Sequence, residues 1–292
     1  MDWHSRRISA ILEHALLEDH ATSDATSRAC IEPQQRATAT ILAKQDCVIA
    51  GVGAIARILE LYERLDQHVI GHPEVISHGE IFDGVRLRKG QVIAVVRHNA
   101  RVLLSCERVT LNVLQRLSGI ATMTRKYVDA IQGTQARILD TRKTAPGLRV
   151  LDKYAVRCGG GHNHRLDLSD GVLIKNNHIA LAGGVAAALQ RVMHNRREGL
   201  PIEVEVRNWT ELQEALANGA ERVMLDNMTV DDARTAVEHI RKHSPSVTVE
   251  ASGGIRLENV RAYAETGVDY ISVGALTHSP QAVDLSMKII PA

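Results

Sequence analysis

The sequence has few aromatic residues and no surplus of charge of one sign. Aromatic side chains make up 3% of its 292 residues, so the chain offers few ring surfaces on which nucleic-acid bases could stack. Lysine and arginine total 35 against 34 aspartate and glutamate residues, which indicates neither a nucleic-acid nor a membrane partner. A local concentration of positive charge is still compatible with binding a small anion.

Cysteines and long apolar runs are also scarce. The four cysteines are widely separated and include no pair at the spacing of a zinc or redox site, so we expect reduced thiols. Residues 1–13 lack the apolar core of a signal peptide. The longest apolar run, 179–189, is far shorter than the ~20 residues that span a bilayer. These features predict a cytoplasmic protein.

From residue 137 onward, short apolar runs alternate with helical patterns. The predicted strands are 137–140, 171–174, 202–206, 222–225, 247–250 and 270–273. Helices are expected to start at Thr210 and Thr229, and to end near Gly219 and Gly267. Such alternation indicates parallel βα units, either in an open doubly wound sheet or, with six or more in series, in a TIM-type barrel.

Reactive or phosphate-binding residue types follow nearly every predicted strand, which favours the barrel. Along the chain they are Thr141, Arg142, Lys143, Lys175, Glu205, Asp226, Ser252, Gly253, Gly254 and Gly274. In a barrel, such residues collect at the mouth formed by the carboxyl ends of the strands. We therefore expect the chemistry of this protein to lie at that mouth.

The first part of the chain has a different pattern. It predicts helices over 10–17, 53–65 and 107–117, and strands within 37–48 and 81–96. We expect a separate α+β domain over residues 1–117 and a barrel over 118–276. The tail, 277–292, is expected to return to the first domain.

The expected mouth is rich in positive charge. The candidates are Arg142, Lys143, His164, Arg165 and Lys175, with Arg108 as a further one. Arginine binds carboxylates and phosphates through two parallel hydrogen bonds, whereas lysine acts as a point charge. One such residue would be an ordinary surface charge, but five at strand ends indicate a polyanionic ligand. Glycine runs at 159–161 and 252–254 would let backbone N–H groups approach a phosphate closely.

Acidic residues complete the pattern. Glu203, Glu205 and Arg207 alternate along one predicted strand, so at least one carboxylate faces the barrel interior. A buried carboxylate needs a partner such as a sugar hydroxyl, a cation or hydrated Mg²⁺. For Glu203, a salt bridge to Lys143 or Lys175 is an equally good interpretation. Carboxylates also stabilise positive charge that develops at an anomeric carbon, so the residues alone are compatible with chemistry at that carbon of a phosphorylated sugar.

Longer motifs are similar to those of one enzyme family. They are Glu107-Arg108, 117–122 (LSGIAT), 140–149 (DTRKTAPGLR), 153–156 (KYAV), 159–165 (GGGHNHR), 173–178 (LIKNNH), 203–205 (EVE) and 250–255 (EASGGI). Together they resemble the quinolinate phosphoribosyltransferases, also called carboxylating nicotinate-nucleotide pyrophosphorylases, over almost the whole chain. The block 140–149 is the most specific of these motifs.

This resemblance implies a fold and an activity. The fold is an incomplete TIM-like barrel of six or seven strands that follows an N-terminal α+β sandwich-like domain. The activity is transfer of the phosphoribosyl group of 5-phosphoribosyl-1-pyrophosphate to quinolinate with decarboxylation, which gives nicotinate mononucleotide, CO₂ and pyrophosphate for NAD biosynthesis. The resemblance also implies a homodimer or larger homo-oligomer, in which Arg108 reaches the neighbouring subunit's site.

The resemblance further implies roles for individual residues. Quinolinate's carboxylates would contact Arg108, Arg142, His164, Arg165 and Lys175; pyrophosphate would contact Lys143 and Lys175; and Thr141 would line the same site. Glu205 and Asp226 would contact the ribose hydroxyls and the waters of Mg²⁺, which enters with the phosphoribosyl substrate. The 5-phosphate would be held by the loops at Ser252, Gly253 and Gly254 and at Val273, Gly274 and Ala275. Lys143, Lys175, Glu205 and Asp226 are thus the predicted catalytic residues.

Other functions are compatible with parts of the pattern. A related phosphoribosyltransferase branch, encoded near molybdate-transport genes, shares the fold. A barrel lyase could use Lys143 or Lys175 to form a Schiff base, although it has no use for so many cations and two glycine runs. A non-catalytic sensor of phosphorylated sugars would bind the ligand without releasing pyrophosphate. The chain also departs from the family at Asn176, where relatives usually carry an acid, and at Ser23, where many carry glycine.

Overall fold

The computed structural model describes residues 1–66, 72–77, 79–197 and 199–292, which divide into two compact units. Unit 1 comprises residues 1–125, 144–160 and 277–292, and unit 2 comprises 126–143 and 161–276. The boundary expected at residue 117 falls inside helix α4 (Ala100–Ala130). No helix in these described ranges is both long and apolar enough to cross a membrane.

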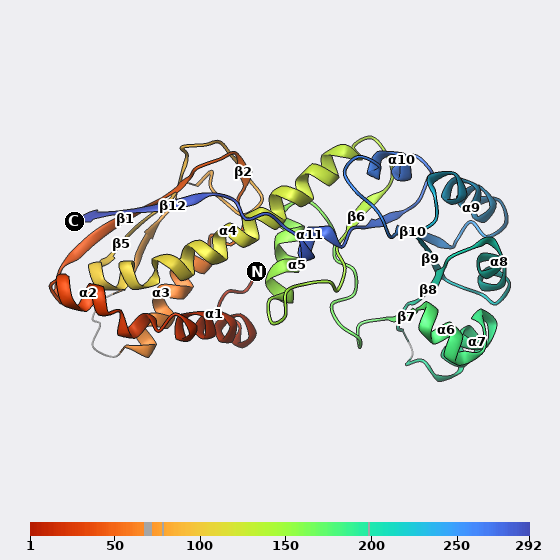
Figure 1. The fold of residues 1–292 in the computed structure, drawn as a ribbon, viewed down its shortest axis with the longest axis horizontal. Helices are drawn as coiled ribbons and strands as arrows, with labels where there is room; N and C mark the ends of the chain where they lie inside the picture. The colour runs from red at the N-terminus through yellow and green to blue at the C-terminus, as the bar shows by residue number, and fades with distance from the viewer. Residues whose placement is uncertain (67–71, 78, 198) are drawn as a thin grey trace. The chain divides into compact units, whose positions relative to one another are not determined.

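Unit 1 contains an antiparallel sheet in the order β12-β1-β5-β3 (Figure 1). Its strands are β1 (Arg36–Ala43), β3 (Glu74–Ile76), β5 (Val92–Asn99) and β12 (Leu285–Pro291). Side chains of β1 alternate between buried and more exposed positions, as expected for a strand with one face on a core. The tail of the chain returns to this sheet, because β12 pairs with β1 along seven residue pairs.

The helices of unit 1 differ in part from those predicted. They are α1 (Arg6–Glu18), a 3₁₀ turn η1 (Ala21–Ser23), α2 (Ala25–Cys30), α3 (Ala54–Leu65), the first part of α4, and α5 (Arg149–Cys158). The sequence reading missed α2, which begins at Asp24, whose carboxylate accepts the backbone N–H groups of Thr26 and Ser27. The predicted strand 37–48 is interrupted, so that β2 (Cys47–Val48) pairs separately with β4 (Arg86–Leu87).

Helix α4 is much longer than the predicted helix over 107–117, because Gly119 does not end it. A Cβ atom at Gly119 would lie 2.3 Å from the carbonyl oxygen of Gln281. This glycine is therefore a point where another segment of backbone packs closely against the helix, and not a helix stop.

Unit 2 is an open, wholly parallel sheet in the order β6-β11-β10-β9-β8-β7. The strands are β6 (Arg137–Leu139), β7 (Val172–Ile174), β8 (Ile202–Val206), β9 (Arg222–Asp226), β10 (Thr248–Ser252) and β11 (Tyr270–Ser272). The helices are α6 (Asn176–Ala182), α7 (Val185–Asn195), α8 (Trp209–Ala217), α9 (Val230–His243) and α10 (Val260–Ala264), and the short α11 (Ala275–His278) begins in unit 2 and ends in unit 1. This arrangement is the predicted incomplete TIM-like barrel, and every predicted strand is present.

Helix starts in unit 2 follow the expected chemistry, with one correction. The Thr229 hydroxyl accepts the backbone N–H of Asp232 and caps α9, as predicted. Helix α8 does not begin at Thr210, because Asn208 is its cap and accepts the N–H of Glu211 through its side chain. Asparagine is at least as good a cap as threonine, which accounts for the earlier start of this helix.

A partly buried ion pair joins α4 and α5 in unit 1. Arg116 donates to both carboxylate oxygens of Asp152, at 2.9 and 2.8 Å, and the Asp152 side chain is fully buried.

We expect Asp152→Asn to lower the free energy of unfolding by about 2–3 kcal/mol. The loss should be smaller than for an ion pair with both partners fully buried, because the Arg116 side chain is 29% exposed and water can partly solvate its charge. Urea unfolding would measure this loss. The control is Asp231→Asn, in a pair with Arg234 where the aspartate is 93% exposed, and it should change stability by less than ~0.5 kcal/mol. Equal losses in both variants would contradict the prediction.

Candidate active site

The residues predicted to bind substrate follow the carboxyl ends of the strands in unit 2. Thr141 and the basic residues come first: Thr141, Arg142 and Lys143 follow β6, and Lys175 follows β7. The acids come next, with Glu205 late in β8 and Asp226 at the end of β9. The predicted phosphate-binding residues come last: Ser252 ends β10 and precedes Gly253 and Gly254, Val273 and Gly274 follow β11, and Ala275 begins α11. All six strands run parallel, so these residues share one end of the sheet. The structure therefore collects them in the way that the sequence predicted.

Arg108 is the exception, because it belongs to unit 1. It is exposed on α4 and lines a cavity of about 720 Å³ together with residues of α1 and the turn at 146–148.

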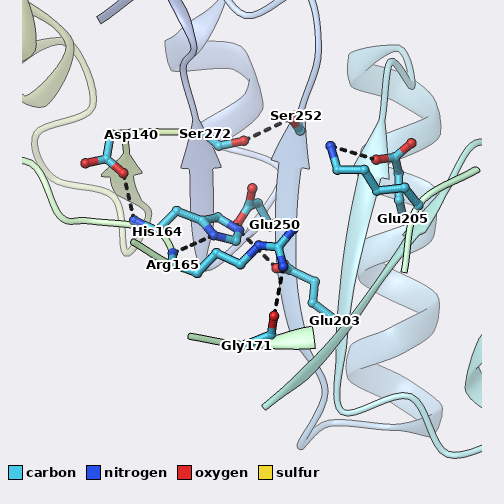
Figure 2. A network of polar contacts seen from close by, with 10 residues as sticks. Asp140, His164, Arg165, Gly171, Glu203, Glu205, Glu250, Ser252 and Ser272 are labelled. Carbon is cyan, nitrogen blue, oxygen red and sulfur yellow. Dashed lines mark hydrogen bonds and ion pairs between the residues drawn. The ribbon is translucent and has the colours of Figure 1, made fainter. Parts of the chain in front are cut away.

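A polar network centred on His164 lies inside the barrel (Figure 2). The backbone N–H of Arg165 donates to Nδ1 of His164 at 2.8 Å, so Nδ1 carries no proton. The proton of the neutral ring is then on Nε2, which donates to Glu203 at 3.0 Å. Both ring nitrogens are thus engaged within the chain. Glu203 pairs with a histidine, which corrects the interpretation of a salt bridge to Lys143 or Lys175.

The backbone at His164 is also anchored to the end of β6. Its N–H donates to Oδ1 of Asp140 at 2.9 Å, and Asp140 is fully buried. Asn163 donates through its side-chain amide to the other oxygen of the same carboxylate. This buried acid holds the segment that carries His164 and Arg165 beside Thr141, the next residue after Asp140.

Glu250 is a member of this network that the sequence reading did not select. It lies on β10 with 2% of its surface exposed, and its Oε2 is 3.6 Å from Nε2 of His164. Burial, and then the nearby charge of Glu203, raises the pKa of Glu250 to about 8. The sequence carries one signal that could have identified Glu250: residues alternate between the two faces of a strand, which places Thr248, Glu250 and Ser252 on one face.

The guanidinium of Arg165 is partly buried beside a second cation. It donates to the carbonyl oxygen of Gly171 at 2.8 Å. Burial lowers the pKa of Arg165, and the positive charge of Arg142 lowers it further. Two guanidinium groups that repel each other in this way are stabilised when an anion lies between them. The pair is therefore suited to a carboxylate or a phosphate.

Glu205 connects the basic and acidic parts of the site. Its Oε2 lies 3.9 Å from Nζ of Lys175, and it accepts a hydrogen bond from the backbone of Asn176. Burial raises the pKa of Glu205, the negative charge of Asp226 raises it further, and Lys175 opposes both effects. Two neighbouring carboxylates of this kind fit a hydrated divalent cation such as Mg²⁺, which binds through one or two carboxylates, water and substrate phosphates.

A second group in the described part of unit 2 also has the ligand types of a metal site. One ligand atom each of His164, Glu203 and Glu250 lies within 4.8 Å of the others. The His164–Glu203 hydrogen bond and the raised pKa of Glu250 already reduce the charge repulsion in this group. The donor set of Glu205 and Asp226 therefore fits a hydrated divalent cation better than this group does.

The phosphate-binding loops predicted after β10 and β11 are joined at their bases. The hydroxyl of Ser272 donates to that of Ser252 at 2.9 Å. Gly253 and Gly254 both have positive φ values, 87° and 64°, which other residues adopt only with strain. The hydroxyl contact thus connects the start of one loop to the start of the other. In the loop after β10, the positive φ values favour glycine at both positions.

Two family models match successive parts of the chain. Residues 24–118 match the family model "Quinolinate phosphoribosyl transferase, N-terminal domain", and residues 120–288 match "Quinolinate phosphoribosyl transferase, C-terminal domain". The chain belongs to the quinolinate phosphoribosyltransferase family.

Similar family members come from several bacteria. The chain is 45% identical to the probable carboxylating nicotinate-nucleotide pyrophosphorylase of Bacillus subtilis (strain 168), over 97% of this chain and 93% of that protein. It is 43% identical to the carboxylating nicotinate-nucleotide pyrophosphorylase of Mycobacterium leprae (strain TN), over 91% of each chain. The crystal structure of nicotinate-nucleotide pyrophosphorylase from Ehrlichia chaffeensis superposes with a TM-score of 0.88 at 36% identity, over 97% of this chain and 98% of that one.

The buried acid of this quinolinate phosphoribosyltransferase family member predicts a pH-dependent stability. The pKa of Glu250 is raised from 4.5 to about 8, so the folded protein binds this proton more tightly than the unfolded chain does. Its contribution to stability is therefore complete below pH 4.5 and is lost as the pH rises through about 8. We expect the free energy of unfolding of Glu250→Gln to fall less than that of the wild type between about pH 5 and about pH 9.

Urea unfolding at several pH values would measure this difference. The control is Glu238→Gln on the exposed face of α9, whose stability should follow the wild-type pH dependence. If Glu250→Gln also followed the wild-type curve, Glu250 would not be the group that titrates.

Proposed function

We propose that this chain transfers the phosphoribosyl group of 5-phosphoribosyl-1-pyrophosphate to quinolinate and that decarboxylation follows. The quinolinate nitrogen attacks C1 of the ribose as pyrophosphate leaves. The adduct then loses the carboxylate next to that nitrogen as CO₂, and the ring carbon takes up a proton. This proposal rests on one observation. In this member of the family, the cations, the acids and the glycine loops all lie at one end of six parallel strands.

The basic residues are suited to quinolinate and pyrophosphate. We assign Arg142, Arg165 and Lys175 to the two quinolinate carboxylates, because the proximity of Arg142 to Arg165 favours an anion between them. Lys143 and Lys175, both exposed at strand ends, are assigned to the leaving pyrophosphate. Point charges of this kind stabilise the negative charge that increases on the leaving group in the transition state.

His164 is assigned to the same pocket, with a condition set by its hydrogen bonds. A quinolinate carboxylate can take the Nε2 proton only in exchange for the bond to Glu203. With the ring held in place, the histidine fixes the backbone N–H of Arg165 and so the start of the Arg165 side chain. Glu203 and Glu250, whose carboxylates lie beside Nε2 of the ring, support this arrangement.

The acidic residues are suited to the ribose and to Mg²⁺. Glu205 and Asp226 are near enough for the charge of one to raise the pKa of the other. We assign them to the ribose hydroxyls and to the waters of Mg²⁺, which would supply positive charge for the pyrophosphate of the substrate. As positive charge develops at C1, the same carboxylates stabilise it.

We further propose that the enzyme is a homodimer or a larger homo-oligomer. Arg108 is exposed on α4 of unit 1, where it lines a cavity that a second copy of the chain could enter or cover. In this proposal the Arg108 side chain supplies a cation to the partner subunit's quinolinate pocket.

The geometry disfavours a Schiff-base lyase. A lysine nucleophile must be neutral, which is favoured by an apolar, desolvated surrounding. The side chain of Lys175 is instead 49% exposed and lies beside the carboxylate of Glu205. Lys175 therefore lacks the apolar, desolvated surrounding that such a nucleophile needs.

The proposed activity predicts release of CO₂ and pyrophosphate from quinolinate with Mg²⁺. Nicotinate, which lacks one carboxylate, should be a worse substrate by ~10⁴ in kcat/KM, because Arg142 and Arg165 would then be left unpaired. Steady-state assays with the two acids would measure this ratio. Comparable rates with nicotinate would contradict the assignment of these arginines, and no turnover of quinolinate would contradict the proposed reaction.

The proposed assembly predicts complementation between two inactive variants. Arg108→Ala should remain folded and oligomeric but inactive, and Lys143→Ala should also be inactive. After subunit exchange, a hybrid dimer has one site with both residues intact, so a share of the activity should return. Exchange can be followed independently with two differently tagged proteins. No recovery despite demonstrated exchange would place Arg108 in its own subunit's site or outside any site.

A further inference from the structure

Asn227, which directly follows Asp226, has an unusual backbone conformation. Its φ is 55°, and the only other non-glycine residue with positive φ in the described ranges is His20. L-residues rarely adopt this left-handed conformation, although asparagine tolerates it better than most. Such a conformation persists only when surrounding contacts hold it, and it is concentrated at functional sites.

Two hydrogen bonds connect Asn227 to neighbouring strand ends. Its side-chain amide donates to Oδ1 of Asp226 at 3.0 Å. Its backbone N–H donates to the carbonyl oxygen of Ser252 at 2.8 Å. Asp226 and Ser252 are themselves partners in the register of β9 and β10. Asn227 therefore joins the carboxylate at the end of one strand to the backbone at the end of the next.

The side chain of Asn227 also lies against Gly253. A Cβ atom at Gly253 would be 2.4 Å from Oδ1 of Asn227 and 2.5 Å from its Cγ. Real Cβ atoms do not approach other atoms so closely, so any larger residue would displace the amide or the loop. The glycine at 253 is thus needed for contact with Asn227 as well as for its positive φ of 87°.

We propose that Asn227 is a positioning residue that sets the distance between the Asp226 carboxylate and the Ser252–Gly254 loop. This inference rests on the proposed function, in which Asp226 contacts the ribose hydroxyls and the loop binds the 5-phosphate. The ribose and its 5-phosphate are covalently joined through a short arm, so the productive position of the ring is reached only when the two protein groups are correctly spaced. A small misplacement can cost ~10² in rate.

The test compares variants that separate the backbone from the side chain. Asn227→Gly keeps the N–H donor and accepts a positive φ, but it removes the amide. Asn227→Asp keeps the shape and replaces the donor with a carboxylate that repels Asp226. The matched control is His20→Gly, which makes the same kind of change at the other positive-φ residue, in unit 1.

Melting temperature, kcat and the KM for each substrate would be measured for all three variants. We expect Asn227→Gly to melt near the wild-type temperature, to raise the KM for 5-phosphoribosyl-1-pyrophosphate and to lower the corresponding kcat/KM by ~10–10². The KM for quinolinate should stay unchanged. Asn227→Asp should lose more activity than Asn227→Gly, and His20→Gly should lose none. A lower melting temperature with normal kinetics in both Asn227 variants would assign a structural role and overturn the proposal.

A double-mutant cycle tests the contact with Gly253. Gly253→Ala alone should lower kcat/KM, because the new Cβ meets the Asn227 amide. The double variant with Asn227→Gly should lose less kcat/KM than the product of the two single fold-losses, since the amide that the new Cβ would meet is then absent. If the two fold-losses simply multiplied, the contact between Asn227 and Gly253 would have no effect on catalysis. A wild-type protein that releases no pyrophosphate would overturn the proposed function itself, whereas an active wild type with an unaffected Asn227→Gly would overturn this inference alone.

Discussion

The parallel register of β8, β9 and β10 determines where four acids of the site lie, namely Glu203, Glu205, Asp226 and Glu250. Glu205 and Glu250 are both in register with Met224 of β9, and Ser252 is in register with Asp226, two residues further along. Aligned residues of parallel strands point to the same face, so the barrel interior has successive layers. Barrel interiors are usually filled by branched aliphatic side chains, whereas these layers carry carboxylates and hydroxyls. Backbone hydrogen bonds between the strands thus set the positions of these acids relative to one another.

The ionisable groups of the barrel interior fall into two sets. In one set, His164 and Glu203 share a hydrogen bond, and the pKa of the neighbouring Glu250 is raised, so that little net charge is buried. In the other set, Glu205 lies beside the cation of Lys175, and the charge of Asp226 opposes that of Glu205. The charge of this second set is therefore less fully compensated within the chain.

The sequence predicted the strands and the residues at their ends because both depend on local signals. Each apolar run is short, and each ends in a residue type that is costly to bury. The His164–Glu203–Glu250 network was not predictable in this way, since its members are far apart in the chain and their pairing depends on register. Local signals also failed at the end of the helix predicted over 107–117, because α4 continues through Gly119, which packs against a distant segment. The predicted start of α8 at Thr210 was wrong, because the side chain of Asn208 caps this helix.

The pairing of β1 with β12 has a consequence for synthesis on the ribosome. Strand β1 (Arg36–Ala43) is made long before one of its two neighbours, which consists of residues 285–291. Until residues 285–291 have been translated and have left the exit tunnel, that edge of β1 has no native partner. An exposed strand edge can pair with another nascent chain, so ribosomes that follow one another on this message present an aggregation hazard up to that point. Chaperone protection of the nascent sheet of unit 1 should therefore matter more for the yield of this protein than protection of β7 to β11, which pair in the order in which they are made.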